Sequence, residues 1–225
     1  INYASTNINL PEGTYTKAEL SAYGFIDNTL TSVKVLPGFK ITLYSDDNFG
    51  GTSKIITSNT NYVGGDFNDK TSSLKIEAEG VSGKAGTYKI KGRNSNLYWD
   101  LKANSLNAGT KIVQYNDEKA EQFQQFKLEE LGKGIYTIYA NTSKMVLDIN
   151  NASAENRAAV QIWTSNNSKC QQYILVDAGD GYYQFVARHC GKVIEVPDNS
   201  STADTELKTW DNNNQKCSHW KLEQP

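Results

Sequence analysis

Three acids and three aromatic residues recur at a fixed spacing in the second half of this chain. The acids are Asp100, Asp148 and Glu195, and the aromatics about fifteen residues later are Tyr115, Trp163 and Trp210. A carboxylate can accept hydrogen bonds from neighbouring sugar hydroxyls, while an aromatic ring stacks on the apolar face of a pyranose. Aromatic residues at strand ends also occur in barrel cores, but buried carboxylates are costly, so packing alone explains the acids poorly. The pattern indicates a protein that binds neutral sugars.

Two oxygen-rich motifs stand in the first third of the chain, in FIDNTLTSVKV (25–35) and FNDKTSSLKI (67–76). Each has an acid or amide pair, two free positions, a hydroxyl pair, and then an alternating apolar strand. Hard oxygen ligands suit Ca²⁺ rather than zinc or copper. One copy could be a simple turn, because Asn, Asp and Ser bond their own backbone. The second copy favours a calcium site.

Composition narrows the classes of protein. The 225 residues suffice for one large or two ordinary domains, and the net charge of −2 argues against a nucleic-acid partner. No apolar run is long enough to predict membrane insertion. Three cysteines allow at most one internal disulfide. The surface, rich in Asn, Ser, Thr and Tyr, suits a secreted or extracellular protein.

Short alternating runs bounded by Gly, Asn, Asp and Ser predict an all-β chain, with Tyr15–Ala22 as the one mild helical pattern. In the first eighty residues, Ala4–Tyr15 aligns without gaps on Gly51–Tyr62. A different unit follows three times, opening GTYKI, GIYTI and GYYQF and closing QQFKL, QQYIL and SHWKL. Its period of about 47 residues is too short for a separate core, so the three copies must close around a common one. The glycine-rich segment 80–86 is the expected linker.

Residues 84–225 resemble the ricin-type β-trefoil lectins and related carbohydrate-binding modules. The resemblance rests on the G-x-Y opening, the apolar-Asp strand, the late aromatic and the Q-x-aromatic close. It implies a β-trefoil over residues 81–225, with repeats at about 84–130, 131–178 and 179–225. It implies core positions at Phe126, Tyr173 and Trp220. It also implies three sugar pockets, formed by Asp100, Tyr115 and Gln124 in the first copy, by Asp148, Trp163 and Gln171 in the second, and by Glu195 and Trp210 in the third.

The third copy lacks the glutamine, because Ser218 stands in its place. Many family members carry an Asn just before that glutamine, where this chain has Phe123, Cys170 and Cys217. We therefore expect the second copy to hold the strongest pocket, the first copy the next and the third copy the weakest.

Residues 1–80 resemble the βγ-crystallins, because IDNTLTS and NDKTSS match their calcium signature and LYSDDNFGG matches their aromatic-to-glycine hairpin. The resemblance implies a Greek-key sandwich with calcium sites shared between two motifs. One site would use the Asn28 side chain, the Thr29 carbonyl, the Thr31 hydroxyl and the Ser45 carbonyl; the other would use Asp69, the Lys70 carbonyl and Ser72. The first Greek key is expected to be truncated, since INYAST already aligns near the end of that hairpin.

No pattern predicts an enzyme. The two histidines lie in no metal or triad pattern, and the acids that stand out are repeated threefold, whereas a catalytic pair needs two different environments. The leading hypothesis is a non-catalytic carbohydrate-binding protein or module that binds a glycan or polysaccharide and carries a calcium-binding crystallin-type domain. The alternative is the receptor-binding part of a toxin, or a protease-inhibitor-like protein-binding module. A third hypothesis makes the crystallin-type unit a spacer beside further domains of a larger chain.

Overall fold

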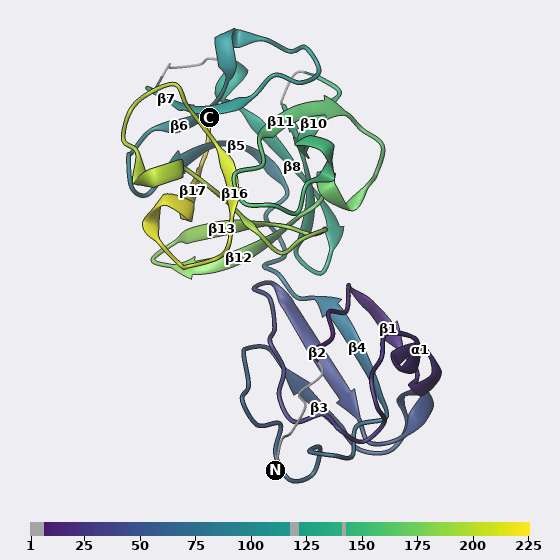
Figure 1. Ribbon diagram of the computed structural model, residues 1–225. Coiled ribbons are helices and arrows are strands. Elements are labelled where there is room, and N and C mark those ends of the chain that lie inside the picture. Colours follow the sequence, from purple (N-terminus) through teal and green to yellow (C-terminus); the bar gives the residue numbers. More distant parts are fainter. Residues whose placement is uncertain (1–6, 118–121, 141–142) are drawn as a thin grey trace. The chain divides into compact units, whose positions relative to one another are not determined.

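The chain divides into two units, residues 1–79 and 80–225, in the computed structural model (Figure 1). The structure describes residues 7–117, 122–140 and 143–225. The boundary lies at the start of the glycine-rich segment 80–86 that the sequence marked as a linker. The residues INYAST, on which the truncated first Greek key was inferred, lie outside the described ranges. Within those ranges, no helix has the length and apolarity needed to cross a membrane.

A four-stranded antiparallel sheet forms the frame of the first unit. Its strands, in the order β1-β4-β2-β3, are β1 (Gly13–Tyr15), β4 (Ser73–Ala78), β2 (Phe39–Tyr44) and β3 (Ser53–Ile56). Leu43 of β2 and Leu74 of β4 face each other in register and are buried, together with Val63 and Phe67 from the loops. One face of the sheet is thereby buried beneath loop residues, among them Phe67 of the second oxygen-rich motif.

The hairpin from β2 to β3 is the aromatic-to-glycine segment LYSDDNFGG. A single turn, η1 (Asp47–Phe49), connects the two strands. Gly51 has a φ of +70°, and a Cβ placed on it would lie 2.1 Å from the Ser45 hydroxyl oxygen. The hairpin therefore requires glycine at this position, both for its left-handed backbone and for the close approach of Ser45.

One short helix, α1 (Lys17–Ala22), follows β1. The sequence pattern began at Tyr15, but the helix begins two residues later, because Tyr15 ends β1 and Thr16 is the N-cap. Thr16 and Glu19 form a reciprocal capping box, in which each side chain accepts a hydrogen bond from the other residue's backbone N–H. Leu20 is the one buried residue of the helix and anchors it to the core of the first unit.

Six strands of the second unit close into a barrel. They are β5 (Gly86–Gly92), β8 (Phe126–Gly132), β9 (Ile135–Ala140), β12 (Tyr173–Gly179), β13 (Tyr182–Ala187) and β17 (Trp220–Glu223). Each pairs antiparallel with the next, and β17 pairs with β5 to complete the ring. Each sequence copy supplies two of these strands, so no single copy could form the barrel.

Three hairpins extend from the barrel, one from each copy. They are β6 (Tyr98–Leu101) with β7 (Ile112–Tyr115), β10 (Met145–Ile149) with β11 (Val160–Thr164), and β14 (Val193–Glu195) with β16 (Lys208–Trp210). A further strand of two residues, β15 (Thr205–Glu206), comes from the third copy and pairs with β7 of the first. A six-stranded barrel with three hairpins is a β-trefoil, as the threefold repeat predicted.

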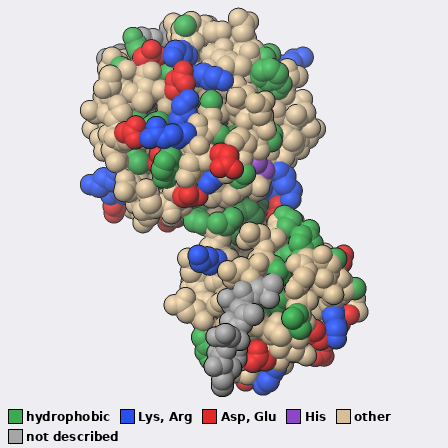
Figure 2. Space-filling model, viewed as in Figure 1, with side chains coloured by type: hydrophobic (Ala, Val, Ile, Leu, Met, Phe, Trp, Pro, Cys, Tyr) green, Lys and Arg blue, Asp and Glu red, His purple; other side chains and the backbone are tan. Residues whose placement is uncertain are grey.

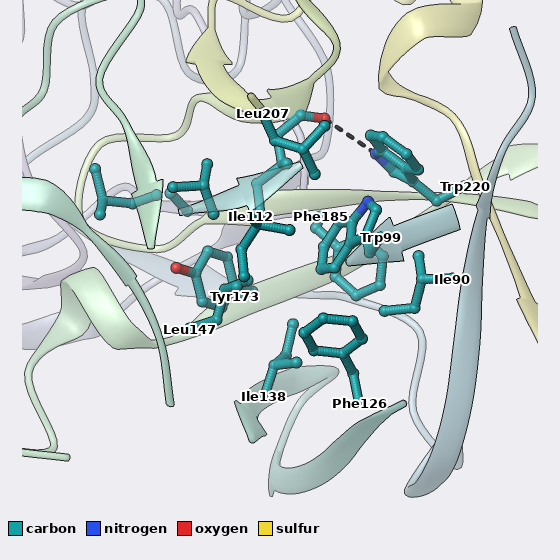
Figure 3. Packing of buried hydrophobic residues seen from close by; sticks show 14 of the residues in the cluster. Ile90, Trp99, Ile112, Phe126, Ile138, Leu147, Tyr173, Phe185, Leu207 and Trp220 are labelled. Carbon is teal, nitrogen blue, oxygen red and sulfur yellow. Dashed lines mark hydrogen bonds between the residues drawn. The ribbon is translucent and has the colours of Figure 1, made fainter. Parts of the chain in front are cut away.

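The barrel encloses one aromatic core (Figure 3). The predicted core positions Phe126, Tyr173 and Trp220 are each no more than 1% exposed, which confirms that expectation. Trp99 contacts Phe126 edge-on and Trp220 edge-on, with ring centroids 5.7 and 5.2 Å apart. The indole Nε1 of Trp220 donates a hydrogen bond of 3.0 Å to the Ile194 carbonyl, so this ring joins the barrel to a hairpin.

We expect Trp220→Ala to lower the free energy of unfolding by about 3–5 kcal/mol, because it removes the largest kind of core side chain and leaves a cavity. Leu131→Ala is the matched control, since Leu131 is 49% exposed and its loss should change stability by less than about 0.5 kcal/mol. Urea unfolding followed by near-ultraviolet circular dichroism measures both. Equal stability of the two variants would contradict the shared core.

Candidate functional site

In each copy the acid and the aromatic residue lie on the same face of one hairpin. In the first copy Asp100 faces Val113, and Tyr98 faces Tyr115. Facing residues of an antiparallel pair point to the same side, as do residues two apart along a strand. Asp100 and Tyr115 are therefore diagonal neighbours on one surface. The other hairpins repeat this register, with Asp148 facing Gln161, Val146 facing Trp163, Glu195 facing Lys208 and Val193 facing Trp210.

A tight turn follows each acid and is the same in all three copies. The turns are η2 (Lys102–Asn104), η4 (Asn150–Ala152) and η6 (Pro197–Asn199). Their middle residues are Ala103, Asn151 and Asp198, whose φ angles are 55°, 56° and 57°. Left-handed backbone is uncommon outside glycine, and three different side chains adopt it here. Asn and Asp adopt this backbone more readily than other residues, so Ala103 is the position where tertiary contacts, rather than local preference, fix the turn.

The first copy contains a cavity of about 350 Å³, in the range of small-ligand sites. Its lining residues are Asp100, Lys102, Ala103, Asn104, Val113, Tyr115 and Asp204. Asp100 is only 4% exposed, and its Oδ2 accepts a hydrogen bond of 2.8 Å from Nε2 of Gln124. The structure thus brings Asp100 and Tyr115 together at one cavity, as the sequence predicted.

The second pocket has the most exposed aromatic of the three. The Trp163 side chain is 45% exposed, which leaves an indole surface open to a ligand. Asp148 is buried beside it, where Oδ1 accepts a bond of 3.0 Å from Gln161 and Oδ2 one of 3.1 Å from Gln171. Oδ2 also accepts a contact of 3.7 Å from the Cys170 thiol, so Oδ1 is the oxygen that keeps the clearer capacity for a sugar hydroxyl.

The third pocket has lost its amide donors. Glu195 is buried and accepts a contact of 3.5 Å from the Cys217 thiol, while Ser218 is hydrogen-bonded to Gln184. Burial is the largest influence on the Glu195 carboxyl and raises its pKa above the usual value. A thiol is a weak donor, so this acid is the least well supported of the three.

The two glutamines that the sequence predicted as sugar ligands lie beneath the pockets. Gln124 and Gln171 are buried at the ends of η3 (Gln122–Gln124) and η5 (Lys169–Gln171). Besides the acid, the Nε2 of Gln124 donates to the Asn116 carbonyl at 2.6 Å and that of Gln171 to the Thr164 carbonyl at 3.0 Å. These side chains hold the acid against the end of the aromatic strand. We assign them a positioning role beneath the pocket.

Sequence reasoning missed four polar residues near the pockets: Lys102, Asn104, Gln161 and Asp204. Three of them line the first cavity, and Gln161 supports the acid of the second pocket. Segments 100–115, 148–163 and 195–210 align without gaps. The acid and the aromatic keep their type in the three segments, whereas the polar residues between them differ from copy to copy and so give no repeated signal.

The two oxygen-rich motifs of the first unit lie against each other. The backbone N–H of Asn28 donates to the Thr71 carbonyl at 3.4 Å, and that of Asp69 donates to the Leu30 carbonyl at 3.2 Å. Asn28 and Asp69 occupy the same place in their motifs and share a left-handed backbone, with φ of 58° and 56°. The motifs therefore meet as two equivalent halves.

Side chains from the two motifs also meet. The Ser72 hydroxyl donates to Oδ1 of Asn28 at 3.4 Å, although the sequence assigned these residues to different calcium sites. The first residue of each motif carries a buried oxygen, Asp27 Oδ1 and Asn68 Oδ1, without a hydrogen-bond partner among the described residues. A buried, unpaired oxygen is costly unless it gains a partner, and a cation would relieve that cost.

The predicted carbonyl ligands are open. Among the described residues, no hydrogen bond reaches the backbone oxygens of Thr29, Ser45 or Lys70. Thr31 was predicted to bind through its hydroxyl, and the Thr31 side chain is exposed. The Thr31 carbonyl accepts a hydrogen bond from the N–H of Val63. The Ser72 N–H donates to the Tyr44 carbonyl at 3.0 Å, so Ser45 lies beside the second motif.

Within the described ranges, no three His, Cys, Asp or Glu side chains come together as a metal cluster. A cation at these motifs would therefore bind mainly to carbonyl, hydroxyl and amide oxygens, with Asp27 and Asp69 as the carboxylates of the two motifs, a donor set that suits Ca²⁺. The three cysteines are free thiols, so no disulfide joins the repeats.

The fold and these pockets define a β-trefoil of the lectin type. The family model for the ricin-type β-trefoil lectin domain-like proteins matches residues 74–163, 122–210 and 169–224. The chain belongs to this family. A designed threefold-symmetric protein, ThreeFoil, is 32% identical, covers 62% of this chain and 99% of its own, and has a TM-score of 0.60.

A second group of relatives matches a shorter part of the chain. Development-specific protein S of Myxococcus xanthus is 36% identical over 84 residues, which are 37% of this chain and 48% of that protein. The chain spans about half the length of the curated relatives it matches, or less. A βγ-crystallin domain from Flavobacterium johnsoniae is 34% identical and covers 36% of this chain and 90% of its own, with a TM-score of 0.34. Both resemblances stated from the sequence, and the all-β fold class, are confirmed.

The raised pKa of Glu195 predicts a pH-dependent stability. Because the folded state holds this proton more tightly than the unfolded state, stability falls as pH rises above about 4.3, the ordinary pKa of glutamate. Glu195→Gln cannot ionise and should escape this loss. The difference in melting temperature, variant minus unmodified protein, should therefore be larger at pH 8 than at pH 4. Calorimetric melting at both pH values measures the difference. A gap that stays constant would show that Glu195 has an ordinary pKa.

Proposed function

We propose that this protein is a non-catalytic, lectin-like carbohydrate-binding protein whose crystallin-type unit binds calcium. The observation that carries the proposal is the pairing of a buried, amide-supported carboxylate with a surface aromatic ring on one hairpin face, in two of the three copies. Asp100 with Tyr115 and Asp148 with Trp163 form these pairs. The family membership of the trefoil supports it.

The pocket chemistry fits a pyranose. The fixed carboxylate accepts hydrogen bonds from two neighbouring hydroxyls, and the ring covers the apolar face of the sugar. The first cavity also holds Asp204, but no second acid shares the hairpin face of Asp100 or of Asp148, and the proposed role of both pockets is to bind sugar without cleaving it. A single open pocket of this kind binds a monosaccharide at about the millimolar scale, or about −4 kcal/mol. Useful affinity then comes from two pockets that engage one polysaccharide.

Calcium is proposed for the first unit. The unpaired oxygens of Asp27 and Asn68, the open carbonyls of Thr29 and Lys70 and the contact between Asn28 and Ser72 support it. Bound calcium would supply positive charge to oxygens that otherwise lack partners. Sites of this kind in extracellular modules have dissociation constants of roughly 10⁻⁴ to 10⁻³ M. Such sites fill only where calcium is abundant, and together with a polysaccharide ligand this favours a secreted or extracellular protein.

We expect Trp163→Ala and Tyr115→Ala each to weaken binding to a multivalent polysaccharide, and the double variant to abolish it. Each substitution removes one stacking platform, and the loss of the second removes avidity as well. Affinity electrophoresis in gels that contain the polysaccharide measures binding. Trp210→Ala is the control, because its copy lacks the amide-supported acid. If the double variant binds as the unmodified protein does, the aromatic residues are not the sugar platforms.

We expect about 10 mM calcium to stabilise the first unit by roughly 1.4–2.7 kcal/mol, because the ion binds only the folded form. Asn28→Ala and Ser72→Ala should each remove part of this gain, and their double variant should lose less than the sum because the two side chains touch. Melting with calcium and with EDTA measures the gain.

Lys70→Ala is the control for these variants, since only the backbone carbonyl of Lys70 is a predicted ligand. A melting curve that calcium leaves unmoved would remove the metal from the proposal. The sugar sites would be unaffected by that result.

A further inference from the structure

Each pocket is bordered by one residue from the preceding copy. In every copy, the residue nine positions after the acid donates its backbone N–H to the carbonyl that precedes the aromatic residue of the next pocket. Gly109 donates to Ile162, Arg157 donates to Thr209 and Asp204 donates to Gln114, each at 2.8 Å. We call Gly109, Arg157 and Asp204 the border residues. One variable position therefore lies beside each of Trp163, Trp210 and Tyr115.

The backbone at the three border positions is the same and favours glycine. The φ angles are 89° for Gly109, 67° for Arg157 and 63° for Asp204. An arginine in this conformation carries a strain that glycine avoids, and strained residues that persist are concentrated at functional sites. The Arg157 side chain therefore requires a reason beyond the turn itself, whereas Asp204 is of a type that tolerates this backbone.

The border residues of the second and third pockets differ in whether they cover the aromatic ring. A Cβ on Gly109 would lie 3.5 Å from Trp163 Cζ3, so glycine leaves that indole uncovered. The Arg157 guanidinium lies 5.4 Å from the centre of the Trp210 ring, within cation–π distance. Its Nη2 is also 3.0 Å from Oδ1 of Asp198, in the turn that borders the third pocket. Arg157 thus lies over one face of the Trp210 ring and takes that face from a ligand.

Asp204 gives the first cavity a second carboxylate. It lines the cavity together with Asp100 and Tyr115. The cation of that lining, Lys102, is already paired with Glu206 at 3.0 Å. Among the described residues, no hydrogen bond or ion pair holds the Asp204 carboxylate, which is exposed. The cavity therefore combines an aromatic ring with two acids and one cation that is shared with Glu206, and a ligand with a positive group would offset the excess negative charge.

We propose that the border residues set the selectivity of the sugar pockets: Asp204 makes the first pocket prefer amino sugars with a protonated amino group, and Arg157 closes the third pocket. The proposal rests on the carbohydrate-binding function above and adds the ligand class. An ammonium group offers charge-assisted hydrogen bonds to Asp204 that an acetamido group cannot form. The second pocket, bordered by Gly109, stays open to neutral sugars.

The test of Asp204 compares glucosamine oligosaccharides with N-acetylglucosamine oligosaccharides of equal length, by calorimetry at pH 6 on the full chain with Trp163→Ala. This background leaves the first pocket as the platform under study. We expect the glucosamine oligomer to bind more tightly, and added Asp204→Asn to weaken it by about tenfold while the acetylated oligomer is unchanged. Asparagine tolerates the left-handed backbone, so the substitution keeps the fold.

Asp177→Asn is the matched control, because it removes the same charge from an exposed residue on β12 that does not line the cavity. It should leave both affinities unchanged. If Asp204→Asn binds both oligomers as its parent does, or if the parent does not prefer glucosamine, the role of Asp204 is wrong. If the unmodified protein binds no sugar of any kind, the proposed function itself fails.

The test of Arg157 uses Arg157→Gly, which copies the residue at the border of the second pocket. We expect greater acrylamide quenching of tryptophan fluorescence, because Trp210 becomes accessible. In a chain with Tyr115→Ala and Trp163→Ala, Arg157→Gly should restore polysaccharide binding, and Trp210→Ala should remove it again. If quenching does not rise and no binding returns, Arg157 does not close the third pocket.

Discussion

Closure of the six-stranded ring, completed where β17 pairs with β5, is the constraint on which the second unit depends. A copy of about 47 residues cannot bury an apolar face alone, so its strands are stable only when the other two copies supply the rest of the wall. The shared core of Trp99, Phe126, Tyr173, Phe185 and Trp220 is the energetic consequence. Every pocket is mounted on a hairpin that extends from this ring, and it inherits its geometry from the closure.

The same threefold arrangement explains why the pockets differ. The backbone repeats closely, in the hairpin register, in the left-handed turns and in the border hydrogen bonds. Equivalent positions are therefore free to carry different side chains without loss of the fold. The acid has an amide donor in two copies and only a thiol in the third, where burial raises its pKa. Symmetry supplies the scaffold, and substitutions within it decide which pockets can bind.

In the first unit the candidate site is also formed by repeated segments that come together, but here two motifs pair, whereas in the second unit three copies close into a ring. The backbone bonds between Asn28 and Thr71 and between Asp69 and Leu30 hold the oxygen-rich segments together. This arrangement leaves Asp27 and Asn68 with buried, unpaired oxygens and leaves several carbonyls open. Polar groups kept in this state cost stability in the absence of a ligand, which is the physical reason to place a cation there.

The sequence by itself determined the all-β class, the two kinds of repeat, the core aromatics and the acid–aromatic pairs, because these depend on local alternation and on a repeated period. It could not determine which residues of different copies touch. Gln124 and Gln171 were predicted from the sequence as sugar ligands, and the structure shows that their amides donate to buried carboxylates, while Asp204 enters a pocket of another copy. Likewise, Asn28 and Ser72, far apart in sequence, meet only when the two motifs pair. Contacts of this kind are set by closure and pairing over long separations, so only the tertiary structure decided them.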